Sequence, residues 1–377
     1  MSTVTHDIGR SPEPGPDGGP PSTTGGTWHV TWHGVRTVAT LELRQRVRST
    51  RWILALVVWF VVVGGITLLT SGAIGFLTGS GGASIYRGPL LFSAVVILVL
   101  GLGLLVTPTL SSTSVNGDRN AGTLATLQVT LLTPAEIVLG KLLASWTASL
   151  AFLGASVPFL GLALAMGGTP VLSFVVALLL LAALLACVCA IGLGFSALVS
   201  RTAGSTVLTF LTVAAVTIIA PILFVLTLPS ISSDAEIRVW TAQVSNGEHV
   251  GSCHWETTTE SVVHTERTWW LLGANPFVVV ADGAGVAASD TEINEPLGGI
   301  RAGVRELRAG PATEQDRCWS ASGQDASSPV AERDLDRSPV WPWGLGINVL
   351  LGAAGVVTAV RRLRVPQQTL ARGTRVA

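Results

Sequence analysis

The sequence predicts an all-α membrane protein with six transmembrane helices, and three observations support this fold class. Of the 377 residues, 49% are hydrophobic and only 12% are charged, whereas soluble proteins carry roughly 25% charged residues. The charged residues avoid five long stretches of the chain altogether. The basic residues of the short connections collect on one side of a six-span arrangement, as expected of a bacterial inner-membrane protein.

Residues 1–34 are predicted to form a disordered cytoplasmic tail. Their first 26 positions are dominated by Ser, Thr, Pro and Gly and contain no apolar run that could be the core of a signal peptide. Over 35–47 an apolar residue recurs at every fourth position, and the arginines lie largely off that row. We expect an amphipathic helix on the membrane surface, with Arg44, Arg46 and Arg48 at the interface. The alternative is that these arginines only set the topology.

Each charge-free stretch can hold at least one span of about 20 residues. The stretch from Leu142 to Ser200 is too long for one helix, and the Gly-Gly-Thr-Pro sequence at 167–170 divides it into spans three and four. Pro221 is expected to kink span five. Spans one, two, five and six are placed near residues 52–69, 89–110, 203–228 and 340–360.

The positive-inside rule gives the predicted orientation. Arginines precede span one and follow span six, and further basic residues lie between spans two and three and between spans four and five. Both termini are therefore predicted to be cytoplasmic. The segment after span five, with eight Arg and seventeen acidic residues, is predicted to lie outside. The expected divisions are a tail (1–34), the amphipathic helix with spans one to five (35–228), an extracytoplasmic loop or domain (229–338), span six (339–361) and a cytoplasmic tail (362–377).

Four cysteines fall into two pairs with different expected roles. Cys253 and Cys318 lie in the external segment, where an oxidising compartment favours a disulfide between them. The alternative is two free thiols in a mobile loop. Cys187 and Cys189 lie within span four at positions that do not share a helix face, so we expect them to be small packing residues.

The external segment also contains the apolar sequence WWLLGANPFVVV at 269–280. It is too short to cross a hydrocarbon core of about 30 Å. One interpretation is a re-entrant or interfacial element at the outer surface, with Trp269 and Trp270 in the interface belt. The other is the core of a small folded external domain.

No pattern in the chain predicts catalysis, a cofactor or a metal site. The spans as placed contain no ionisable residue, which disfavours an ion-coupled carrier. The single lysine, Lys141, follows Gly140 but precedes Leu142, so no phosphate-binding loop is present. Three histidines near Cys253 lack metal-ligand spacing, and the net charge of zero gives no indication of a nucleic-acid partner.

The most informative segment is the predicted cytoplasmic connection from Gly117 to Lys141. It has a polar start at Asp118 and Arg119, an apolar body too short to span the membrane, and a polar exit that includes Glu136. This pattern predicts an amphipathic hairpin on the inner surface that could press against a cytoplasmic partner.

This segment resembles the signature of the type-2 ATP-binding-cassette exporter permeases. In that family an acidic-basic pair precedes Gly-Thr-Leu, and Glu-Ile leads into Gly-Lys at the start of the third span. The matching residues are Asp118, Arg119, Gly122, Thr123, Leu124, Glu136, Ile137, Gly140 and Lys141. The chain departs from the family in having Asp118 where Glu is usual and in the later position of Pro134. Shorter sequences at 44–46, 275–277 and 361–364 look like those of actinobacterial members.

The resemblance implies the permease subunit of an ATP-driven exporter, which forms the substrate pathway and is not itself an enzyme. Its implied partners are membrane lipid, a second permease copy or paralogue, and a separately encoded ATPase that holds ATP and Mg. The implied ATPase-coupling surface comprises Asp118, Arg119, Gly122, Thr123, Glu136, Gly140 and Lys141. The alternative function is a membrane-anchored sensor or scaffold with a ligand-binding extracytoplasmic domain. The sequence does not name a substrate.

Overall fold

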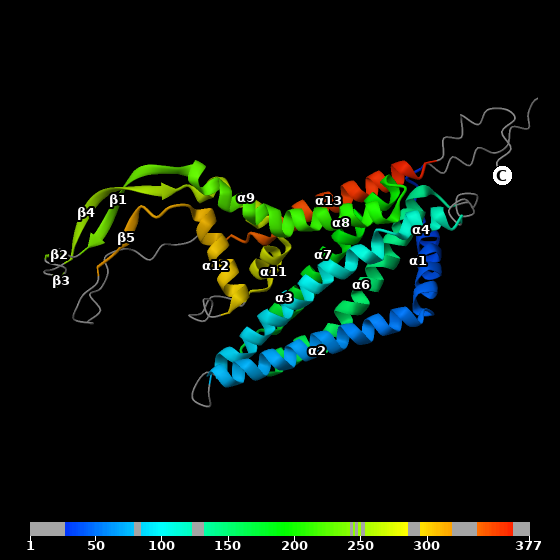
Figure 1. Cartoon of the computed structure of the whole chain (residues 1–377), viewed down its shortest axis with the longest axis horizontal. Helices are drawn as coiled ribbons and strands as arrows, with labels where there is room; N and C mark the ends of the chain where they lie inside the picture. Colours follow the sequence, from blue (N-terminus) through cyan, green and yellow to red (C-terminus); the bar gives the residue numbers. More distant parts are fainter. Residues whose placement is uncertain are drawn as a thin grey trace, which may run out of the picture.

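Long helices that lie side by side dominate the computed structural model, and a small β-sheet extends from one end of them (Figure 1). The structure describes residues 27–78, 84–122, 132–241, 244–245, 248–249, 253–285, 295–318 and 338–364. The predicted tails fall mostly outside these residues, as does the apolar body of the predicted hairpin at 123–131.

Within the described residues, six helical segments are long and apolar enough to cross a membrane, which confirms the predicted number. They are Thr50–Ala73, Arg87–Asn120, Pro134–Ala165, Val171–Leu198, Thr202–Ile231 and Trp341–Arg362. The corresponding helices are α2 (Thr50–Thr78), α3 (Ser84–Ser111) with α4 (Ser114–Asn120), α6 (Pro134–Ala165), α7 (Val171–Leu198), α8 (Thr202–Ala214) with α9 (Ala220–Thr227), and α13 (Trp341–Arg362). A further helix, α1 (Trp32–Val47), precedes them.

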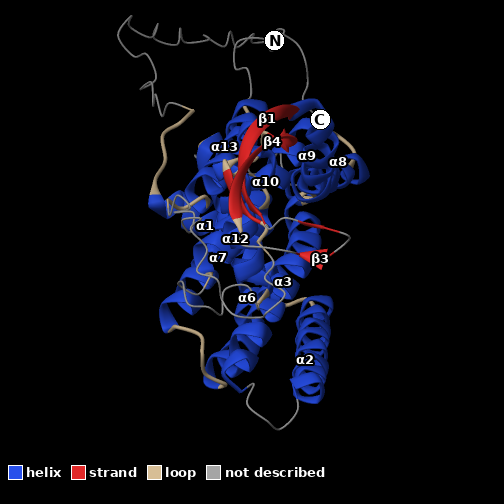
Figure 2. Cartoon of the chain, turned by 90° about the vertical axis from the view of Figure 1, so that its left-hand side faces the viewer, coloured by secondary structure: helices blue, strands red, loops and turns tan. Residues whose placement is uncertain are grey.

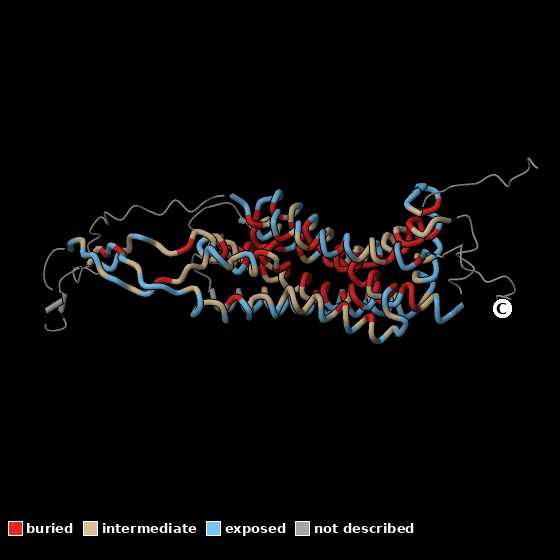
Figure 3. Tube along the Cα trace, turned by 90° about the horizontal axis from the view of Figure 1, so that it is seen from above, coloured by how far each residue is buried: buried red, intermediate tan, exposed pale blue. Residues whose placement is uncertain are grey.

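Helix α7 lies at the centre of the bundle. It contacts α3, α6, α8 and α13, and its apolar residues point in all directions, as expected of a helix surrounded by others. Buried residues accordingly follow the middle of the molecule, whereas the outer faces are exposed (Figure 3). At one end, a second cluster joins Val115 of α4, Ile137 of α6, Leu193 of α7 and Val360 of α13. We call this the α4 end of the bundle, and the opposite one the sheet end.

The third span begins at Pro134 and not near Leu142, which corrects the sequence prediction. Thr133 and Glu136 form a capping box that starts the helix early. The prediction that no span contains an ionisable residue is therefore wrong for this helix, because Glu136 and Lys141 both lie in it and both are buried. A charge-free run marks the start of a span only if no charge lies inside the helix. Glu136 and Lys141 lie inside this one because both have partners within the protein.

Span five changes its helical geometry ahead of the predicted kink. Residues Ala215–Ile219 form a π-helical turn, and Pro221 follows it in the first turn of α9. In an α-helix the carbonyl of Thr217 would accept from the N–H of residue 221, but proline has none. The side-chain amide of Asn275 donates to that carbonyl instead, at 3.0 Å. Asn275, from the segment between spans five and six, thus replaces the hydrogen bond that Pro221 removes.

The sheet, in which Figure 2 labels β1 and β4, consists of three strands in the order β4-β1-β5. Strand β1 (Ser232–Thr241) pairs antiparallel with β4 (His254–Val263) and parallel with β5 (Glu314–Asp316). A two-stranded pairing of β2 (Val244–Ser245) with β3 (Glu248–His249) lies between β1 and β4 in the chain. Alternate residues of β1 face a small apolar cluster with Val262.

A disulfide and an ion pair connect β4 with the residues that directly follow β5. Cys253 and Cys318 form a disulfide with their Cα atoms 5.9 Å apart. Both carboxylate oxygens of Glu260 accept from Arg317, at 2.6 and 2.7 Å. Because the Arg317 guanidinium donates these bonds, the pKa of Glu260 lies below its usual value.

The apolar sequence at 269–280 forms α10 (Trp270–Gly273) and the start of α11 (Pro276–Ala284). Helix α11 packs against α7, α13 and α12 (Pro296–Ala309), and Val279, Val280 and Ala281 are fully buried in the main core. Because this segment packs against the span helices, it does not form the core of a separate domain, and its position relative to the membrane stays a prediction. The buried Asp282 carboxylate fixes this arrangement by accepting from the N–H groups of Val340 and Trp341 and from Arg305.

Candidate functional site

Lys141 lies in a buried ion cluster at the α4 end. Its side chain is 0% exposed, and its ammonium pairs with the carboxylates of Glu42 from α1 and Asp118 from α4, the latter at 2.5 Å. It also donates to the carbonyl of Ser114 at 3.2 Å. A buried ammonium without such partners would cost several kcal/mol. The cluster therefore fastens three helices, α1, α4 and α6, to one another.

Glu136 makes a second link between α1 and α6. One carboxylate oxygen accepts from the N–H of Thr133 at 2.8 Å and completes the capping box of α6. The other accepts from the N–H of Thr31 at 2.8 Å and from the Thr31 hydroxyl. Thr31 is in turn the N-cap of α1, so this helix begins at Trp32, inside the stretch assigned to the tail.

The two helices approach closely because glycines lie at their contact. A Cβ at Gly34 would come within 2.7 Å of the Glu136 carboxyl carbon, and one at Gly140 within 2.5 Å of the Cβ of Val38. Val35, Val38 and Ala39 are accordingly buried. The apolar side of α1 thus has α6 as its partner, which the sequence pattern alone did not show.

Helix α4 is held on its other side by hydroxyl groups. The N–H groups of Val115 and Asn116 both donate to the Ser196 hydroxyl of α7, at 3.0 and 3.1 Å. The Asn116 side chain donates to Ser205 of α8, whose hydroxyl donates to the carbonyl of Ser112. Four helices therefore determine the position of α4.

Toward solvent, α4 ends in an exposed turn. Arg119, Asn120, Ala121 and Gly122 are all exposed. Gly122 has φ +72°, a conformation that suits glycine. We call these four residues the α4 tip.

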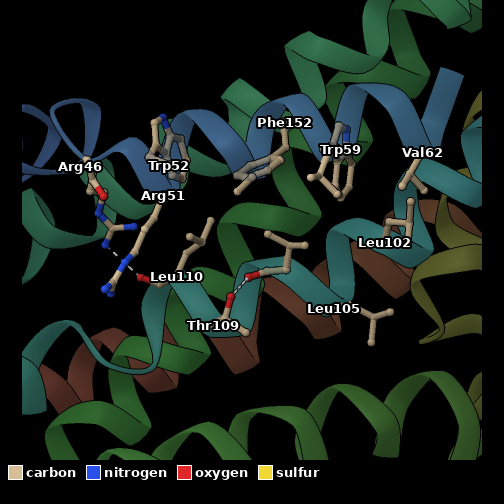
Figure 4. A pocket seen from close by; sticks show the side chains of 14 residues that line it. Arg46, Arg51, Trp52, Trp59, Val62, Leu102, Leu105, Thr109, Leu110 and Phe152 are labelled. Carbon is tan, nitrogen blue, oxygen red and sulfur yellow. Dashed lines mark hydrogen bonds between the residues drawn. The ribbon is translucent and has the colours of Figure 1, made fainter.

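A groove of about 690 Å³ lies between α2 and α3, with Phe152 of α6 at its base. Arg46 and Arg51 lie at one end, and aromatic and aliphatic side chains line the rest (Figure 4). The rings of Trp52 and Trp59 meet Phe152 edge-on, with centroids 5.1 and 5.2 Å away.

Arg46 is oriented by the protein. One guanidinium nitrogen donates to the carbonyl of Leu110 at 2.9 Å. Burial lowers the pKa of Arg46 from its ordinary value and the carboxylate of Glu42, one turn earlier, opposes the shift. The group stays cationic at neutral pH because arginine is not deprotonated in proteins.

The family model described as ABC-2 family transporter protein matches residues 36–257. This match includes most of α1, the first five spans and the connection that contains α4. The chain belongs to the ABC-2 transporter family. It is therefore a multi-pass membrane permease of a kind that generally works with a separate ATPase subunit. No curated protein matches the chain.

In this ABC-2 permease, the residues predicted to form one coupling surface separate into two sets. Glu136, Gly140 and Lys141 are buried and hold α1 against α6, and the half-buried Asp118 joins them. Arg119 and Gly122 lie in the exposed α4 tip. Thr123 and Leu124 lie outside the described residues.

The three arginines predicted to lie at the membrane interface also differ in their surroundings. Arg44 on α1 and Arg48 at its C-cap are exposed, whereas Arg46 turns inward to Leu110.

Sequence reasoning missed Glu42 and Thr31, which complete the two buried links. A signal for Glu42 was present, since it is the only acidic residue between Asp17 and Asp118 and lies among five arginines. Thr31 gave no such signal, because threonine before a helix indicates only a cap. Cys187 and Cys189 are buried free thiols.

Proposed function

We propose that this chain is the permease subunit of an ATP-driven exporter in a bacterial inner membrane, and that the α4 tip is where its ATPase docks. One observation carries the proposal: α4 is fixed by α1, α6, α7 and α8, yet ends in an exposed turn. A force applied to this tip acts on several spans at once, because α4 is bonded to helices that belong to different spans. Rigid-body movement of packed helices is an established way to switch a membrane protein between states.

The α4 end is cytoplasmic in this proposal. Exposed arginines gather there on α1, on the α4 tip and at the end of α13, including Arg44, Arg48, Arg361 and Arg362. This agrees with the positive-inside rule. The sheet end carries the Cys253–Cys318 disulfide, which suits an oxidising compartment. Helix α1 then lies at the inner surface with its exposed arginines toward headgroups.

A second copy of the chain, or a paralogue, completes the transporter. Span five supports this part of the proposal, because it is the least buried of the six described spans. Its exposed face carries large apolar residues such as Val207, Leu211 and Ile222. In a bilayer that face contacts either lipid or another permease. The substrate pathway forms between the two copies, and ATP and Mg bind to the partner ATPase.

The test is co-expression of the full-length chain with an ATPase that is encoded beside it and carries a phosphate-binding loop. The two should co-purify, and ATP hydrolysis should require the ATPase subunit. Purification of the permease free of every such ATPase would contradict the proposal. It would favour the sensor or scaffold function, for which the external sheet would bind the ligand.

A further inference from the structure

The groove between α2 and α3 has a charged end and an apolar body. Arg46 and Arg51 lie at the end nearest α1, and Trp52, Trp59, Val62 and Leu105 line the rest (Figure 4). Among the described residues that line the groove, none carries a carboxylate. A molecule that fits must therefore be anionic at one end and apolar along the remainder.

The groove is open along its length, and its base is rigid. Helices α2 and α3 lie close together near the loop that joins them and separate toward the α4 end (Figure 1). Phe152 and the two tryptophans form an interlocked base, and the indole N–H of Trp59 donates to Ser156 at 2.9 Å. Contacts among the protein's own side chains therefore shape the groove, and its open side lies on the outer face of the span helices.

Its length matches one leaflet. The lining residues of α2 run from Arg51 to Val62, which corresponds to about 16 Å at 1.5 Å per residue. Half of a hydrocarbon core of about 30 Å is nearly the same length. An acyl chain that starts at the arginines would therefore reach the end of the groove near the bilayer midplane. The volume of about 690 Å³ lies within the range of roughly 300–1,000 Å³ for ligand sites.

The cationic end is suited to a phosphate group. The bond from Arg46 to Leu110 uses one nitrogen, and a guanidinium offers five donors in a fixed fork that matches phosphate oxygens. Glu42, the nearby acid, pairs with Lys141 and does not line the groove. Arg51, at the start of α2, is exposed, so two positive charges lie at the same end of the groove.

We propose that this groove binds one anionic phospholipid, with its phosphate at Arg46 and Arg51 and one acyl chain along Trp52, Trp59 and Leu105. In the topology proposed above, the lipid comes from the inner leaflet. Basic pockets between spans on the cytoplasmic side are a recognised means of holding anionic headgroups.

The test is native mass spectrometry of the purified full-length chain with phosphatidylglycerol or phosphatidylcholine of identical acyl chains. The wild type should retain one phosphatidylglycerol in preference to phosphatidylcholine. Arg51→Gln should reduce that preference about fivefold, the effect expected for one basic residue near an anionic headgroup. Arg48→Gln is the matched control, because it removes the same charge from an exposed position outside the groove. Val58→Trp, which fills the groove, should weaken binding of both lipids.

Three results would overturn the proposal. The first is equal retention of the two lipids by the wild type. The second is an equal loss in Arg48→Gln and Arg51→Gln, which would indicate a general surface charge. The third is a lipid on the monomer that is absent from the dimer, which would make the groove a contact between copies. None of these measurements needs ATP or the ATPase, so they are independent of the exporter assignment.

Discussion

Lys141 is the residue whose role changes most between sequence and structure. The family resemblance placed it on a surface, whereas it is buried between two carboxylates from other helices. We expect Lys141→Ala to lower the free energy of unfolding by about 1–3 kcal/mol, because it leaves two partly buried carboxylates without their cation. Glu42→Gln should cost less, since Asp118 remains as a partner.

The measurement is thermal unfolding of the purified chain in detergent, with Arg48→Ala as the control for loss of an exposed charge. Combining Lys141→Met with Glu42→Gln and Asp118→Asn should recover part of the lost stability, because no isolated charge is then buried. If Lys141→Ala and Arg48→Ala unfolded at the same temperature, the cluster around Lys141 would not contribute to the stability of the fold.

Among the larger elements, span five and the segment at 269–280 are linked through Asn275. Asn275→Ala removes the donor to the Thr217 carbonyl and the cap of α11 together. We expect a loss of about 1–3 kcal/mol from the unsatisfied carbonyl. In a Pro221→Ala background, residue 221 has its own N–H, so the same substitution should cost less. A double-mutant cycle on thermal stability measures this coupling, and additive losses would show that Pro221 and Asn275 act independently.

The three-stranded sheet offers a separate check on element stability. Cys253 and Cys318 should resist thiol labelling in intact cells until a reductant is added, because the disulfide closes a long loop that the proposed topology places in an oxidising compartment. Cys253→Ser with Cys318→Ser should loosen the sheet while membrane insertion is unaffected, since the spans do not depend on this link. Immediate labelling of both thiols in the wild type would show that the bond is not formed in the cell.

The sequence was most informative for elements whose position in the chain depends on one physical property. Charge-free runs located all six spans, because a lipid environment excludes unpaired charge over a whole helix. The same reasoning placed the start of α6 too late, since the partners of Lys141, Glu42 and Asp118, lie on other helices. The alternatives for residues 269–280 stayed open for a similar reason. Whether a short apolar segment packs on spans or on its own domain depends on contacts that no local pattern encodes.

At the scale of the whole molecule, the buried and exposed parts of the signature predict different phenotypes. Glu136→Ala removes the capping box and the link to Thr31. It should therefore reduce stability, and any loss of coupling would accompany that effect. Arg119→Ala changes only an exposed side chain of the α4 tip, so the fold should be unaffected. Only the second substitution can separate docking from folding.

ATP turnover by the reconstituted permease–ATPase complex is the most direct test of the central claim that the α4 tip couples the two subunits. Arg119→Ala should weaken co-purification of the ATPase and reduce permease-dependent ATP hydrolysis by about tenfold or more, if the lost contact is a desolvated charge pair at the interface. Its thermal stability should equal that of the wild type. Arg36→Ala, an exposed charge on α1, should leave both properties unchanged. Wild-type co-purification and hydrolysis in Arg119→Ala would contradict the claim and leave the α4 tip as a connector between spans two and three.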